Sequence, residues 1–174
     1  GRLHPVKGFE DLLAALSTIG STLYHRPLYL VIVGDGPLNI RLRNYADQIG
    51  VGERVCWVGW QLDPHPYYEL ADLLICPSRH EPLGNVILEA WAHCRTVLST
   101  RTAGALELID NGEDAWLVPP QQPQALADGI RQLLADGPLR ERLAANGRTK
   151  VEKHYSQQHI VNAYLDLYRR LLAE

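Results

Sequence analysis

Residues 72–90 read DLLICPSRHEPLGNVILEA, and they place a strand, a loop and a helix in succession. The run Asp72–Cys76 is apolar after its first residue, as expected of a strand that is covered on both faces. Pro82 disfavours helical conformation at Glu81, so this carboxylate is expected in the loop. Asn85 is a good N-cap and predicts that the helix starts there. A buried strand that leads into a helix is the repeating unit of a parallel sheet.

The same alternation continues along the chain. It predicts an α/β fold: a doubly wound, Rossmann-like parallel sheet with helices on both faces and a helical C-terminal tail. The other predicted strands are also apolar runs, and we expect each of them to be covered on both faces. They are Tyr29–Val33, Val55–Val58, Thr96–Ser99 and Ala115–Val118. The predicted helices are Phe9–Leu16, Leu38–Ile49, Pro66–Leu70, Asn85–Cys94, Ala105–Ile109, Pro123–Ala135, Pro138–His154 and Gln157–Leu172.

The composition is that of a single globular domain. The chain has 174 residues, is 46% hydrophobic and 21% charged, and has a net charge of -3. No cluster of Lys and Arg predicts a nucleic-acid surface, and no apolar run is long enough to span a bilayer. The cysteines are odd in number and lack a C-x-x-C spacing, so we expect buried thiols in a reducing, cytoplasmic compartment. They are Cys56, Cys76 and Cys94.

Two carboxylates stand where a ligand would bind. In open α/β sheets the ligand lies beyond the carboxyl ends of the strands, where Glu81 follows a strand and Glu89 lies one turn inside the next helix. The first N–H groups of that helix would point into the same crevice and could hold an anion. Taken alone, these residues leave open that Glu81 is a solvated loop residue and that Glu89 only favours the helix dipole.

The segment from Ser78 to Ala92 resembles the signature of family 4 of the retaining glycosyltransferases, in which two glutamates flank seven residues. The resemblance covers essentially the whole chain. The chain departs from the family in two places. Cys94 and Thr96 stand where the family usually has Gly and Pro, and Ala103-Gly104 stands where it often has a double Gly. Further matching phrases are Gly1-Arg2-Leu3, Lys7-Gly8, Val33–Pro37, Val55–Gly59, Ala71-Asp72 before Pro77-Ser78, and Tyr155-Ser156 before Tyr164 and Tyr168.

This resemblance implies the nucleotide-sugar donor domain of a two-Rossmann (GT-B type) enzyme that retains anomeric configuration. Residues 1–174 would be one donor-binding domain, and the N-terminal acceptor domain would be absent. The lack of any Met and the start at Gly1 are typical of a fragment, and we expect this fragment to be inactive alone. Most of the central strand that would end at Gly1-Arg2-Leu3 is absent, and we expect residues outside this sequence, a shifted segment or a strand from another chain to fill its place. We expect the apolar stripe of 157–172 to be partly exposed, packed on a neighbour or mobile. Its residues are Ile160, Tyr164, Leu167, Tyr168 and Leu171.

The resemblance also implies a role for each site residue. Arg2 and Lys7 would neutralise the diphosphate, and Glu81 would bind hydroxyls of the donor sugar; these three are the expected catalytic residues. Glu89 would accept hydrogen bonds from the ribose. The remaining donor-binding residues would be Gly84, Asn85 and Val86 through their amides, and Trp60 and Gln61 beside the base.

No cofactor or metal is expected beyond the substrate, a UDP- or GDP-linked sugar, because the chain has no D-x-D motif. The acceptor would be a bacterial glycan or lipid, with the parent enzyme in the cytoplasm or at the inner face of the membrane. His80 is expected to be an exposed loop residue and His93 a structural one. Two alternatives stay open: an inactive or regulatory nucleotide-sugar-binding module, and a sugar epimerase or phosphorylase of related fold.

Overall fold

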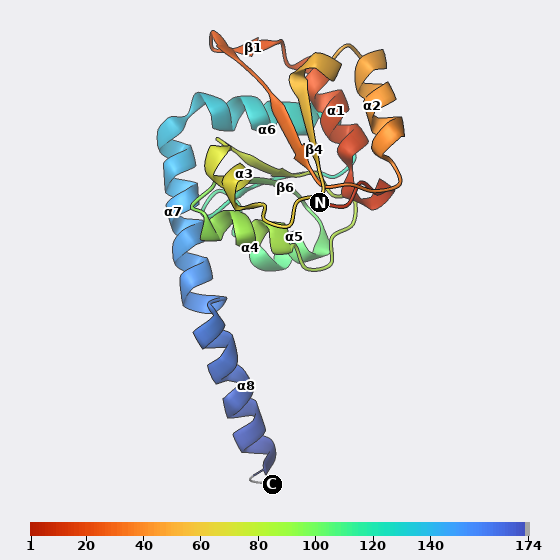
Figure 1. The fold of residues 1–174 in the computed structure, drawn as a ribbon. Coiled ribbons are helices and arrows are strands. Elements are labelled where there is room, and N and C mark those ends of the chain that lie inside the picture. Colours follow the sequence, from red (N-terminus) through yellow and green to blue (C-terminus); the bar gives the residue numbers. More distant parts are fainter. Residues whose placement is uncertain (173–174) are drawn as a thin grey trace.

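The computed structural model describes residues 1–172 and contains two parallel sheets (Figure 1). In the first, β3 (Leu30–Val33) pairs with β4 (Val55–Gly59). In the second, β6 (Val97–Thr100) lies between β5 (Leu74–Cys76) and β7 (Trp116–Val118). Each of these pairings is parallel, which confirms the predicted type of sheet.

The predicted helices are present, with ends that differ by a few residues from those expected. Helix α6 keeps the predicted bounds Pro123–Ala135, and α8 keeps Gln157–Leu172. The others are α1 (Phe9–Thr18), α2 (Asn39–Gln48), α3 (His65–Leu70), α4 (Asn85–Ala92), α5 (Ala103–Leu108) and α7 (Gly137–His154).

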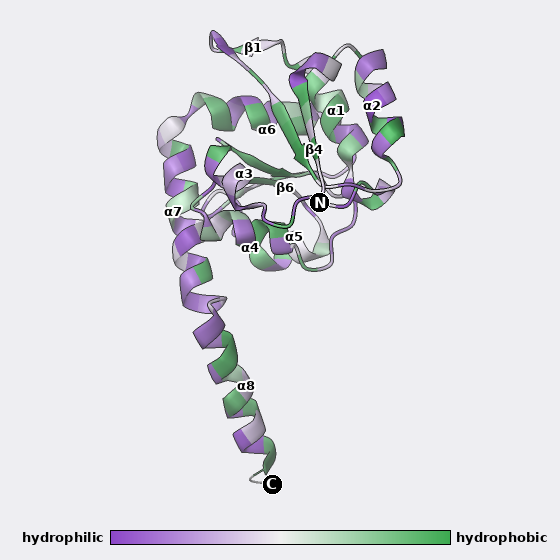
Figure 2. Ribbon diagram, in the orientation of Figure 1, coloured by the Kyte–Doolittle hydropathy of each residue, from purple (hydrophilic) through white to green (hydrophobic). Residues whose placement is uncertain are grey.

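Strand β6 shows why the fold is doubly wound. All its residues are buried. Leu98 packs into a cluster with residues of α1 and α6, whereas its neighbour Val97 packs with residues of α4 and α5. Because successive side chains of a strand point to opposite faces, the sheet is covered by helices on both sides. The strands accordingly form an apolar centre within helices that are polar on the outside (Figure 2).

A further core joins the first sheet to its helices. Ile32 of β3 packs with Leu13 of α1 and Leu42 of α2, and all of them are buried. The opposite face of this sheet is open, since the paired residues Val31 and Cys56 are both exposed. The prediction that this strand is covered on both faces is therefore wrong.

The prediction that all the cysteines are buried is also wrong. Cys56 lies on the open face of β4, and Cys94 is exposed in the turn after α4, where its φ is 53°. Cys76 is buried at the end of β5, and this burial raises the pKa of its thiol.

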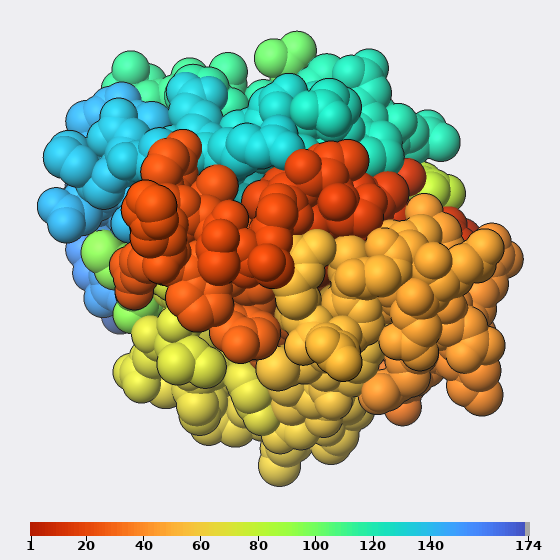
Figure 3. Space-filling model, turned by 90° about the horizontal axis from the view of Figure 1, so that it is seen from above, coloured from red at the N-terminus to blue at the C-terminus, as the bar shows by residue number. Residues whose placement is uncertain are grey.

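A hairpin between α1 and β3 was not predicted. It pairs β1 (Thr22–Leu23) with β2 (Arg26–Pro27) in antiparallel register. The turn residues Tyr24 and His25 both have positive φ, which residues other than Gly seldom adopt. Seen from above, this segment lies beside α6 (Figure 3), where the Tyr24 hydroxyl donates to the Arg131 carbonyl.

Residues 1–8 connect the carboxyl ends of the two sheets. The Leu3 N–H donates to the Asp35 carbonyl after β3 (2.9 Å), and the Arg79 N–H after β5 donates to the Val6 carbonyl (2.8 Å). Among residues 1–172 no strand pairs with both β3 and β5, so no segment of the described chain replaces the expected central strand. Replacement by residues outside this chain stays a prediction.

Helix α8 projects away from the domain (Figure 1), and none of its residues is buried. The exposed apolar stripe predicted for residues 157–172 is thus confirmed. Within residues 1–172, no helix is both long and apolar enough to cross a membrane. All the predicted side chains of the stripe are exposed, namely Ile160, Tyr164, Leu167, Tyr168 and Leu171, and so are Val161, Leu165 and Leu172.

Candidate active site

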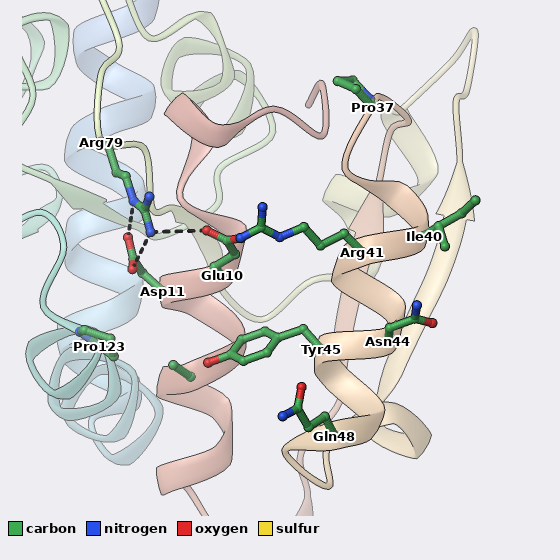
Figure 4. Close-up of a pocket in the computed structure, with 11 residues that line it drawn as sticks. Glu10, Asp11, Pro37, Ile40, Arg41, Asn44, Tyr45, Gln48, Arg79 and Pro123 are labelled. Carbon is green, nitrogen blue, oxygen red and sulfur yellow. Dashed lines mark hydrogen bonds and ion pairs between the residues drawn. The ribbon is translucent and has the colours of Figure 1, made fainter.

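The loop between β5 and α4 is anchored to the chain start. Both the Arg79 and the His80 N–H groups donate to the Val6 carbonyl (2.8 and 3.1 Å). The Arg79 guanidinium also makes two hydrogen bonds with the Asp11 carboxylate, of 2.8 and 2.9 Å (Figure 4). This paired, bidentate geometry is specific to Arg, so it fixes the loop against α1.

Glu81 is a buried carboxylate with two partners. The Lys7 ammonium forms an ion pair with it, and the Ser78 hydroxyl donates to the same carboxylate oxygen (3.2 Å). The Thr100 hydroxyl, at the end of β6, donates in turn to the Ser78 carbonyl. Residues from three separate segments thus determine where the Glu81 carboxylate points, which is typical of a preorganised site.

Lys7 reaches Glu81 because Gly8 allows a close approach of two backbones. Gly8 has φ of 68°, and a Cβ added to it would lie 1.9 Å from the Pro77 carbonyl oxygen. A side chain at this position would therefore be excluded both by conformation and by space. The short 3-10 helix Pro5–Lys7 consequently lies against the end of β5.

Helix α4 begins at the crevice with Gly84 as its N-cap, so Asn85 is the first helical residue rather than the predicted cap. Gly84 has φ of 82°, a backbone conformation that favours glycine over Asn with its Cβ. As first residues of the helix, Asn85 and Val86 have N–H groups without a carbonyl partner inside it. These N–H groups, together with the Lys7 ammonium, supply the donors that an anion needs.

The start of α5 closes the other side of the loop. The Gly104 N–H donates to the Glu81 carbonyl (2.9 Å). A Cβ at Gly104 would lie 2.7 Å from the Leu83 nitrogen, so this glycine is required for the contact. The neighbouring residue, Ala103, is exposed and departs from the double Gly that the family often has.

Glu89 lies on the exposed side of α4, one turn after Asn85. Its carboxylate accepts a hydrogen bond of 2.6 Å from the Tyr68 hydroxyl of α3. The Gly1 amino group donates to the Val33 carbonyl at the end of β3. Burial and then the charge of Lys7 lower its pKa, whereas the charge of Glu89 raises it.

Three predicted residues have fewer contacts. Arg2 is exposed and makes no hydrogen bond or ion pair within residues 1–172. Trp60 is 70% exposed, and Gln61 donates to the Val58 carbonyl (3.4 Å). The loop that carries them lies next to the one after β3, since the Gly34 N–H donates to the Gly59 carbonyl.

The two histidines near the site, His80 and His93, differ in their surroundings. His80 is exposed in the loop, as expected. The ring of His93, just after α4, stacks on Tyr68 at 4.8 Å between centroids and contacts the Glu89 carbonyl through Nδ1 (2.7 Å). In the described part of the chain, no three His, Cys, Asp or Glu residues are grouped to hold a metal ion.

A groove of about 870 Å³ between α1 and α2 shares Arg79 with the loop but is lined by neither Lys7 nor Glu81 (Figure 4). Its cations are already paired, because Arg41 and Arg79 both contact Glu10. In the groove, therefore, neither of these two guanidinium groups is left unpaired for a ligand. The better candidate site is the loop between β5 and α4, with its N–H donors and carboxylates.

Three residues that position the site were not identified from the sequence: Tyr68, Arg79 and Thr100. Arg79 lies inside the signature, between Ser78 and Glu81, so its position in that motif was a usable signal. Tyr68 and Thr100 come from other elements, so only the three-dimensional contacts reveal them.

The comparisons with known proteins agree with this geometry. The profile described as Glycosyl transferases group 1 matches residues 1–150. The lipopolysaccharide core biosynthesis glycosyltransferase LpsE of Rhizobium meliloti is 37% identical over 167 residues, which are 96% of this chain and 47% of LpsE. The chain therefore spans about half the length of this relative.

Solved structures share the fold. Sucrose-phosphate synthase from Thermosynechococcus elongatus matches with a TM-score of 0.89 and 32% identity, over 99% of this chain and 44% of that one. HepE of Anabaena, solved in complex with UDP, matches with a TM-score of 0.87 and 24% identity, over 100% of this chain and 47% of that one. The Rossmann-like fold and the resemblance to glycosyltransferases are confirmed, and the chain belongs to the glycosyl transferases group 1 family.

Proposed function

We propose that this chain binds a nucleoside-diphosphate sugar and is the donor-binding domain of a retaining glycosyltransferase. One observation carries the proposal: the ion pair of Lys7 with Glu81 lies at the carboxyl edge of the sheets, in the loop that leads into α4, and the first N–H groups of α4 and then Glu89 follow it along the chain. This edge is where α/β folds bind nucleotides. The names of the relatives, such as LpsE, agree with it.

In this proposal the cations act on the leaving group. When the bond between the sugar and the diphosphate breaks, negative charge develops on the phosphate oxygens, and fixed cations stabilise it. Lys7 has three N–H donors, so it can keep Glu81 and still bind a phosphate. Arg2 is exposed next to Gly1 at the same edge and is free to reach the second phosphate.

The two carboxylates would bind different parts of the donor. Glu81, held by Lys7 and Ser78, would accept hydrogen bonds from sugar hydroxyls. Glu89, one turn into α4, would accept from the ribose, and Trp60 with Gln61 would flank the base. The nucleotide would be UDP or GDP.

We propose further that residues 1–174 form one domain whose acceptor site lies on a preceding domain, and that the acceptor is a glycan or a lipid. The chain spans 47% of LpsE, and the exposed stripe of α8 leaves a surface for such a domain. A regulatory module without activity is less favoured, because Lys7 and Glu81 form an ion pair and Glu89 is present on the helix that follows.

The test is calorimetry on the 174-residue chain with UDP, GDP and ADP, and with their glucose conjugates. Glu89→Ala should weaken every nucleoside diphosphate that binds, by about 1.5–3 kcal/mol, because a charged acceptor of the ribose is lost. Glu81→Ala should spare the free nucleotide and weaken only the nucleotide sugar.

Glu141→Ala is the matched control, since it removes an exposed carboxylate from α7. It should leave every affinity unchanged. The absence of heat with all six ligands would refute donor binding, and equal losses for nucleotide and nucleotide sugar in both variants would refute the division of roles.

A further inference from the structure

The carboxylate of Glu89 is held by one specific side chain. The hydroxyl of Tyr68, on the neighbouring helix α3, donates to Glu89 Oε2 at 2.6 Å. Tyr68 is only 8% exposed, whereas Glu89 lies on the open side of α4. A buried, ordered donor therefore fixes a side chain that would otherwise rotate in solvent, where a long Glu side chain has considerable rotamer entropy.

The ring of Tyr68 is itself fixed by its surroundings. It packs in the apolar cluster that contains Ile87 and Trp91 of α4, both fully buried. On its other side it stacks on the His93 ring, with an interplanar angle of 17°. His93 contacts the Glu89 carbonyl (2.7 Å), so the stacking partner is attached to the same helix as the carboxylate. The Tyr68 hydroxyl thus has a defined position relative to Glu89.

The chemistry of the pair leaves one carboxylate oxygen for a ligand. Burial, and secondly the hydrogen bond to Glu89, raise the pKa of Tyr68, so its hydroxyl stays a donor at neutral pH. An ionised carboxylate has two acceptor oxygens. Tyr68 uses Oε2, and within residues 1–172 Oε1 has no hydrogen-bond partner.

We propose that Tyr68 is a positioning residue, which holds the Glu89 carboxylate so that Oε1 accepts a hydrogen bond from the 2′,3′-diol of the ribose in a nucleoside diphosphate. This inference rests on the proposed donor-binding function and adds a residue to it. Tyr68 itself does not contact the ligand. Its contribution is preorganisation, because a carboxylate that is already oriented loses less freedom on binding.

The test uses calorimetry with UDP, GDP and ADP and with the 2′,3′-dideoxy form of each, which lacks the diol. Tyr68→Phe keeps the ring and removes only the hydroxyl, so it should weaken binding of the ribonucleotide roughly three- to tenfold. Its affinity for the dideoxy nucleotide should equal that of the unmodified chain. Tyr67→Phe, a neighbouring hydroxyl deletion on α3, is the control and should change neither affinity.

A double variant separates positioning from a purely structural effect. If Tyr68 acts through Glu89, Tyr68→Phe should cause no further loss in a Glu89→Ala chain, because residues that act together are not additive. Unchanged binding of the dideoxy nucleotide also shows that Tyr68→Phe is folded. Equal losses for both nucleotides, or additive losses in the double variant, would overturn the inference.

The two proposals fail in different ways. If Glu89→Ala weakens the ribonucleotide but Tyr68→Phe does not, the positioning role is wrong and the ribose-binding role of Glu89 stands. If Glu89→Ala has no effect, or the unmodified chain binds ribo and dideoxy nucleotides equally well, the assignment of Glu89 to the ribose is wrong and the role of Tyr68 is wrong with it.

Discussion

Helices α6 and α8 are both amphipathic, yet only α6 is covered. Leu126, Ile130 and Leu133 of α6 pack against the sheet and α1, and all are buried. On α8, Tyr164 is 57% and Tyr168 is 56% exposed. Figure 2 shows the apolar side of α8 facing solvent. The comparison shows that helical periodicity predicts an apolar face on a helix. It does not predict which element packs against that face, because this depends on the elements that lie nearby.

The largest expected effect comes from truncating matched leucines on the two helices. Leu133→Ala removes a side chain with 0% exposure from the α6 core, and we expect the free energy of unfolding to fall by about 2–5 kcal/mol. Leu165→Ala on α8, where the side chain is 44% exposed, should change it by less than about 0.5 kcal/mol. Urea denaturation followed by circular dichroism measures both. Similar losses at the two positions would contradict the contrast between the helices.

Helix α7 connects the covered helix to the uncovered one, and Gly147 marks where it packs. A Cβ at Gly147 would lie 2.1 Å from the Trp91 ring, which is fully buried and donates to the Asp114 carbonyl. Gly147→Ala should therefore lower the free energy of unfolding by about 1–3 kcal/mol through overpacking. This is the opposite of the gain of about 0.5–1 kcal/mol that Ala normally gives inside a helix.

Gly137, at the start of the same helix, is the control. A Cβ there would have no neighbour within 4 Å, so Gly137→Ala should be neutral or slightly stabilising. Thermal unfolding of both variants compares them directly. A stabilised Gly147→Ala variant would show that the contact between α4 and α7 is loose.

The sequence was sufficient for the element order because each strand is a short apolar run and each helix has a periodic face. It was insufficient where conformation depends on other segments. The hairpin at Thr22–Pro27 has no Asn-Gly or Gly-rich turn, since Tyr24 and His25 provide the positive φ values. The open face of β3 could not be predicted either, because the sequence of an apolar strand is the same whether or not a neighbouring element covers that face.

The site divides in the same way. The signature places Glu81 and Glu89 correctly on the loop and on α4, since both follow from local sequence. The partners that orient them come from distant segments: Lys7 lies 74 residues from Glu81, and Tyr68 lies 21 residues from Glu89. No local pattern encodes such pairs. The roles assigned to Arg2, Trp60 and Gln61 stay predictions until ligand binding is measured.

The smallest expected effect, and the most direct test of the comparison, is removal of α8. Deleting residues 157–174 should change the free energy of unfolding of the remaining domain by less than about 0.5 kcal/mol, because none of the residues of α8 is buried and surface changes cost little. It should also lower self-association, measured by sedimentation velocity, because a contiguous apolar surface is removed.

The deletion leaves Val151 and Tyr155, which pack beside Trp91, in place. Ending the chain before Val151 is the contrasting variant and should cost more than about 1 kcal/mol, since it removes these partly buried side chains. A loss of that size from the shorter deletion would mean that α8 packs on its own domain, and the contrast with α6 would then be wrong.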